Sequence, residues 1–149
     1  MSRPVPLYTT SSEVSDGLIE ELQATFHSAP SSPPPGLIQH VPNSDWAIGS
    51  SPTDILKRHR QDHIREFAAK PLVILDDQTV RDKTVLLVEP RLGEDGAPLQ
   101  PIDARSLRFE PSTVSVTAMN LKISNQSIEE LEYHVDQDGI WREFRKIDS

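Results

Sequence analysis

The chain contains no cysteine, so disulfides and thiolate chemistry are excluded. Aromatic residues make up only 5% of its 149 residues, and nowhere do eighteen apolar residues follow one another, as a membrane-spanning helix would need. The opening residues, MSRPVPLYTT, hold no apolar run of signal-peptide length. These absences predict a soluble intracellular protein, and we expect it in the cytoplasm.

Positive charge is scarce as well. Fifteen Lys and Arg residues stand against 23 Asp and Glu residues, which gives a formal net charge of −8. A field of this sign repels phosphate backbones and anionic lipids, so we expect neither nucleic acid nor a membrane as partner. The length suits a single domain over residues 1–149.

Apolar runs alternate with helical patterns along the chain, which is typical of an α/β fold. Strands are expected at 4–10, 37–41, 72–75, 84–88 and 105–109, and by alternation also at 113–117 and 120–123. Helices are expected at 14–26, 52–67 and 128–135, and loops at 29–36 and 91–101. We therefore predict a mixed, mostly parallel sheet of five or six strands with three principal helices, and with 72–75 and 84–88 at its centre.

The segment NLKISNQSIEELEYHVDQDGIWREF, residues 120–144, carries the clearest local signals. Ser127 followed by Glu130 is a capping-box pattern, and Leu131 and Val135 continue one apolar stripe of a helix. Glycine at 139 suits the end of that helix, because it adopts positive φ without strain. We expect Leu131 and Val135 to face the core.

This closing segment resembles the ending of an uncharacterised, domain-of-unknown-function family of small acidic α/β proteins found in bacteria and fungi. The resemblance rests on Asn120, Leu121, Asn125, Glu129, Glu130, Val135, Asp136, Asp138, Gly139, Arg142 and Phe144. A weaker similarity covers LVILDDQTV and TVLLVE, at Asp77, Thr79 and Glu89. The resemblance implies an α/β fold and a shared surface, and it implies no reaction.

The stretch KRHRQDHIR, residues 57–65, is the one basic cluster of the chain. A solvated helix face with an Arg58–Asp62 pair explains it without any function, whereas a basic face on an acidic protein can also engage an acidic partner or another copy. We predict a non-catalytic interaction or accessory protein that binds a protein partner or itself. Its expected contacts are Arg58, Arg60, Trp141 and Phe144, since Arg and aromatic residues supply most interface anchors.

The alternative is a small-molecule enzyme or ligand-binding domain. Asp76 and Asp77 follow the run LVIL, and Glu89 ends the run TVLLV, so these carboxylates would converge if the two strands were parallel neighbours. No nucleophile, glycine-rich phosphate loop or histidine partner has a suitable spacing for catalysis. We therefore favour the interaction hypothesis over an enzyme.

His59 and His63 have the i, i+4 spacing that can present two imidazoles to one metal ion. The zincin pattern needs Glu directly after the first His, and Arg60 stands there instead. We expect no metal site at this pair and no cofactor.

Overall fold

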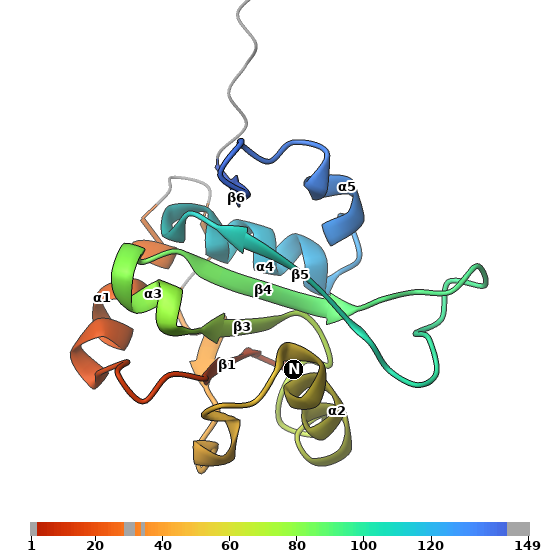
Figure 1. The fold of residues 1–149 in the computed structure, drawn as a ribbon, viewed down its shortest axis with the longest axis horizontal. Coiled ribbons are helices and arrows are strands. Elements are labelled where there is room, and N and C mark those ends of the chain that lie inside the picture. Colours follow the sequence, from red (N-terminus) through yellow and green to blue (C-terminus); the bar gives the residue numbers. More distant parts are fainter. Residues whose placement is uncertain (1–2, 29–31, 34, 143–149) are drawn as a thin grey trace, which may run out of the picture.

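The computed structural model describes residues 3–28, 32–33 and 35–142. They form one six-stranded sheet in the order β2-β1-β3-β4-β5-β6 (Figure 1). The strands are β1 (Val5–Thr9), β2 (Ile38–His40), β3 (Leu72–Leu75), β4 (Val85–Pro90), β5 (Ala104–Phe109) and β6 (Ile140–Trp141). Pairing is parallel for β1–β2, β1–β3 and β5–β6, and antiparallel for β3–β4 and β4–β5. The predicted mixed, mostly parallel sheet with β3 and β4 at its centre is confirmed.

In the part of the chain that the structure describes, five α-helices accompany the sheet, and three of them are long. The helices are α1 (Asp16–Phe26), α2 (Pro52–Asp62), α3 (Asp77–Asp82), α4 (Val114–Lys122) and α5 (Ile128–Glu132), with short 3-10 turns η1 (Asp45–Ala47) and η2 (Pro111–Thr113). Within the described residues, none of these helices has both the length and the apolar character needed to cross a membrane. Three principal helices are confirmed, but the third is α4 rather than the helix expected at 128–135.

The two faces of the sheet carry separate hydrophobic clusters. Helices α1, α4 and α5 cover one face, where Phe26, Leu121 and Leu131 pack against the side chains of β3 and β4. Helix α2 covers part of the opposite face through Ile55 and Leu56 (Figure 1). Alternate residues of each strand serve the two faces, so the apolar run of β3 is buried at every position.

Helix α4 occupies the segment that alternation assigned to strands at 113–117 and 120–123, so that expectation is wrong. Its buried positions have helical spacing: Val114, Ser115, Thr117, Ala118 and Leu121. Val and Thr favour strands because their side chains are branched at Cβ, but this preference is small. Packing of the whole apolar face against the sheet outweighs it.

Helix α3 lies in the polar connector between β3 and β4, where the sequence analysis placed no helix. It has no apolar stripe, but a capping box starts it: Asp76 Oδ1 accepts a hydrogen bond from the Thr79 amide, and Thr79 Oγ1 accepts one from the Asp76 amide. Lys83, at φ 65°, ends it in the left-handed conformation. Helix α3 therefore depends on its caps rather than on hydrophobic periodicity.

Helix α5 is shorter than expected, because it ends at Glu132 instead of reaching 135. Gly139, at φ 79°, does not end the helix but lies in the turn that leads into β6. The expected core contacts of this segment are confirmed: Leu131 is buried and Val135 packs partly against the same cluster.

Candidate functional site

Helix α2 carries the predicted basic face. Ser51 caps it by accepting a hydrogen bond from the Asp54 amide over 3.2 Å, and Pro52 occupies its first turn. Ile55 and Leu56 pack towards the sheet, which turns Lys57 and Arg58 to solvent and leaves Arg60 half-buried. The placement of the basic residues therefore follows from the amphipathic pattern of the helix.

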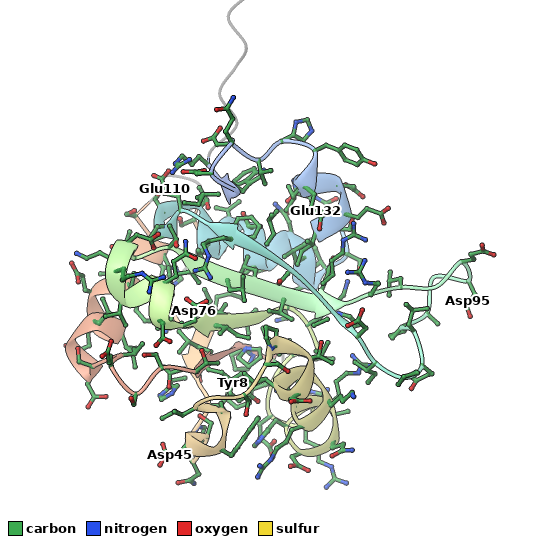
Figure 2. All side chains as sticks on the ribbon, in the orientation of Figure 1. Tyr8, Asp45, Asp76, Asp95, Glu110 and Glu132 are labelled. Carbon is green, nitrogen blue, oxygen red and sulfur yellow. The ribbon has the colours of Figure 1, made fainter. Side chains whose placement is uncertain are left out.

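His59 is fully buried beneath this face and belongs to the fold. Its Nε2 donates a hydrogen bond to the Ala68 carbonyl oxygen over 2.8 Å, because a carbonyl oxygen can only accept. Its Nδ1 then accepts a hydrogen bond over 2.6 Å from the hydroxyl of Tyr8, which is labelled in Figure 2. Burial lowers the pKa of His59 to about 4, and burial together with the nearby Asp62 charge raises the pKa of Tyr8.

The two histidines are not arranged as a metal site. Both ring nitrogens of His59 are already used in hydrogen bonds, so a metal ion would have to displace Tyr8 or Ala68. His63 lies nearly parallel to the Trp46 ring, at an interplanar angle of 6° and a centroid distance of 6.2 Å. Within the described part of the chain, no three His, Asp or Glu residues form a metal-binding group.

A shallow groove of about 460 Å³ runs beside Trp46. The Arg58 guanidinium lies 4.3 Å from the centre of the Trp46 ring, a cation–π arrangement, and its Nε is 3.5 Å from the Asp62 carboxylate. Glu66 and Phe67 complete much of the wall. Arg58 therefore has two partners within the chain, whereas Lys57 and Arg60 on the same helix have no ion pair among the described residues.

Among the described residues, most cations elsewhere in the chain pair with a carboxylate, whereas most cations near α2 do not. Ion pairs hold Arg58, Lys83, Arg91, Arg105, Arg108 and Arg142. In residues 3–28, 32–33 and 35–142, the cations without a carboxylate partner are Arg3, Lys57, Arg60, Arg65, Lys70 and Arg81. All of these except Arg81 belong to α2, to the segment after it, or to the N-terminal segment bound to it. We call Arg3, Lys57, Arg60, Arg65 and Lys70 the basic surface.

Arg3 and Lys70 extend this surface beyond the cluster visible in the sequence. Arg3 Nη1 donates a hydrogen bond of 2.6 Å to the carbonyl oxygen of Ile64, a residue 61 positions away. No local pattern signals such a contact. The chain therefore gathers more positive charge beside α2 than residues 57–65 contain.

The strand-end carboxylates do not converge. β3 and β4 run antiparallel, with Leu72 opposite Val88 and Ile74 opposite Leu86, so Asp76 and Glu89 lie at opposite ends of the strand pair. The parallel arrangement that the ligand-site alternative requires is absent from this pair. Asp77 is exposed in the first turn of α3.

Asp76 has a structural role at its own end. Its Oδ2 lies 2.5 Å from Nη2 of Arg108, whose side chain is 14% exposed. Its Oδ1 caps α3, at the start of which Figure 2 labels Asp76. Burial alone would raise the pKa of Asp76, but the hydrogen bonds and charge of Arg108 and the Thr79 hydrogen bonds hold it below its ordinary value. This cluster ties α3 to β5.

Glu89 also supports a helix. It is buried, and its Oε1 accepts a hydrogen bond of 2.7 Å from the Ile128 amide in the first turn of α5. Burial raises the pKa of this carboxyl, and Ile128, Lys70 and Arg105 oppose that rise. The helix dipole explains a carboxylate at this place.

Trp141 was expected to be an accessible anchor, and that expectation is wrong. It is 8% exposed and packs against Phe109 with ring centroids 5.6 Å apart, as part of the core that covers one face of the sheet. Arg142, next to it, is held by Asp136 and Asp138. Phe144 lies outside the described residues.

A protein-family model matches residues 19–144, which is most of the chain. The chain belongs to the DUF6924 family. DUF6924 is described as a domain of unknown function, so the predicted membership in such a family is confirmed and no activity comes with it. The DUF6924 match includes α2 and the strand-end carboxylates, whereas Arg3 and Tyr8 precede it. Neither the curated proteins nor the solved structures contain a significant match.

Proposed function

We propose that this protein acts by binding another protein rather than by catalysis, as an interaction or accessory protein of the cytoplasm, and that the basic surface carries the contact. The observation behind the proposal is that, among the residues the structure describes, five cations without ion pairs gather beside α2, in a chain whose net charge is −8. Unpaired positive charge in one place favours an acidic partner surface and speeds its encounter.

The other predicted contacts do not contribute equally to this proposal. Arg60 is retained, because it has no carboxylate partner in the described part of the chain. Arg58 already pairs with Asp62 and stacks on Trp46, so we assign it to shaping the groove. The strand-end carboxylates are assigned to the fold, since Asp76 caps α3 and Glu89 supports α5.

Charge reversal with a matched control tests the proposal. The tagged protein and its Arg60→Glu, Arg65→Glu variant are used to capture partners from native cells, followed by quantitative mass spectrometry. Arg81→Glu serves as the control, because Arg81 lies on α3 and not on the basic surface, and is an exposed cation that has no ion pair with any described residue. We expect acidic partner proteins to be lost from the first variant and retained by the control. Equal capture by all three proteins would contradict the proposal.

A further inference from the structure

The positive and negative side chains of α2 and of the turns after it lie on different sides. Asp62 and Glu66 line the groove beside Trp46. Lys57 and Arg60 are three residues apart, so they share one side of the helix, and neither lines that groove. The carboxylates of this segment are therefore turned to the groove, whereas the basic surface lies outside it.

The N-terminal segment adds a cation whose position is fixed. Arg3 Nη1 donates a hydrogen bond to the Ile64 carbonyl oxygen, and the Ala68 amide donates one of 2.8 Å to the Pro4 carbonyl oxygen. The Lys122 ammonium donates to the Arg3 carbonyl oxygen. A guanidinium has five N–H donors, so one contact leaves most of them without a partner among the described residues. Arg3 is therefore held beside the turns after α2 with donors to spare.

An exposed apolar side chain lies among these cations. Ile64 is 38% exposed, follows Arg60 by four residues and directly precedes Arg65. The His63 amide still donates to the carbonyl oxygen four residues before it, so the helical path continues past the end of α2 to the residue before Ile64. The Ile64 carbonyl oxygen holds Arg3. Ile64 therefore has a cation on the turn before it, another directly after it and a third bound to its backbone.

We propose that the basic surface binds a short acidic segment of a partner protein, in which one large apolar residue packs on Ile64. Carboxylates on either side of that residue meet Arg60 and Arg65. The binding of such a segment rests on the proposed function, because it uses the same surface, and it specifies the partner. Each guanidinium can hold a carboxylate by two parallel hydrogen bonds, and the exposed part of Ile64 gains from an apolar contact.

A short segment suits this protein better than a long polyanion. Of its 15 Lys and Arg residues five form the basic surface, so ten remain against 23 Asp and Glu residues. A DNA duplex carries one negative charge per about 1.7 Å and would extend beyond the basic surface, where the acidic remainder of the chain repels it. Its phosphates also offer no apolar partner to Ile64. A segment of a few residues stays within the surface.

Fluorescence anisotropy with labelled synthetic peptides at about 0.15 M NaCl tests the inference. The first probe is Glu-Glu-Asp-Leu-Glu-Asp-Glu, and two matched probes carry Ala in place of Leu, or Gln and Asn in place of the acidic residues. The Ala probe should bind the wild-type chain about fivefold more weakly, because it loses the apolar contact. The amide probe should bind about tenfold or more weakly, because it loses the opposite charge. A labelled DNA duplex of mixed sequence should bind more weakly than the first probe.

Variants of the protein locate the site. Arg65→Glu should weaken binding of the Leu probe about tenfold or more, whereas Arg81→Glu should leave it unchanged. Ile64→Ala should bind the Leu and Ala probes equally, because their difference depends on contact with Ile64. Leu92 is 54% exposed and lies outside the basic surface, so Leu92→Ala should keep the fivefold preference for Leu. Urea unfolding checks that each variant is folded.

Equal binding of the Leu and Ala probes to the wild-type chain, a Leu preference that survives in Ile64→Ala, no binding of any probe, or tighter binding of DNA would overturn the inference. These outcomes are separate from failure of the proposed function. If the peptides fail but Arg60→Glu, Arg65→Glu still loses captured acidic proteins, the partner presents a folded acidic surface rather than a segment, and the proposed function stands. If capture is also insensitive to reversal, both proposals fall.

Discussion

At the start of α3, the Arg108 guanidinium reaches both oxygens of the Asp76 carboxylate, and both side chains are largely buried. Beside α2, Arg60 and Arg65 have no carboxylate partner in the described part of the chain. The first arrangement uses charge to connect two elements of the fold, and removing one member would leave the other without its partner. The second leaves charge unpaired and costs the fold little. Charge in this acidic protein is therefore paired where it connects elements of the fold, and unpaired beside α2, where the proposed function would use it.

The largest effect on stability is expected at Leu131, through which α5 packs against the core. The exposed Glu130 on the same helix provides the control. Leu131→Ala should lower the free energy of unfolding by about 2–5 kcal/mol, because it removes buried methyl groups and leaves a cavity. Glu130→Ala, one residue away and exposed, should change it by less than about 0.5 kcal/mol. Urea titrations of both variants make the measurement, and similar losses would show that α5 does not face the core.

The buried His59 beneath the basic surface should make stability fall in mild acid. Its pKa is about 4 in the folded chain and 6.5 in the unfolded chain, so between these values the unfolded chain binds the additional proton. Stability is thus fully present above about pH 6.5 and decreases by up to about 3 kcal/mol as the pH falls to about 4. The raised pKa of Glu89 acts in the opposite direction, so the slope is compared with that of His59→Gln. An equal slope in both proteins would contradict the buried neutral histidine.

Asp76→Ala should cost about 2 kcal/mol, because α3 loses its cap and Arg108 its carboxylate partner. The exposed neighbour Asp77 supplies the control, and Asp77→Asn should be nearly neutral in thermal unfolding. If both substitutions were neutral, the Asp76–Arg108 pair would not be a stabilising connection and the contrast with α2 would disappear.

The smallest effect on stability is expected at the basic surface itself. Arg60→Glu together with Arg65→Glu should change the free energy of unfolding by less than about 0.5 kcal/mol, since neither side chain has an ion pair within the described residues. Urea unfolding of the variant and of Arg81→Glu provides the measurement. A loss comparable to that of Asp76→Ala would mean that the basic surface serves the fold.

Local patterns in the sequence were sufficient for the elements that have caps and a clear apolar period. Ser127 caps α5 as predicted, and Ser51 caps α2 in the same way, because a hydroxyl before an apolar helical stripe satisfies free amides at the helix start. The apolar runs at 72–75 and 84–88 likewise identified the two central strands, because a strand covered on both faces favours a nearly continuous apolar run.

Tertiary structure decided what depends on distant residues. Val114 to Lys122 is a helix because its apolar face packs on the sheet, against the local preference of its branched side chains. The direction of β4 relative to β3 separated Asp76 from Glu89, and pairing direction leaves no mark in either strand's sequence. Contacts across 61 and 51 residues brought Arg3 to Ile64 and Tyr8 to His59. Sequence alone determined which residues are charged and where the capped helices and the two central strands form, whereas packing decided that Val114–Lys122 is a helix, which charges are neutralised within the chain and which are left at the surface.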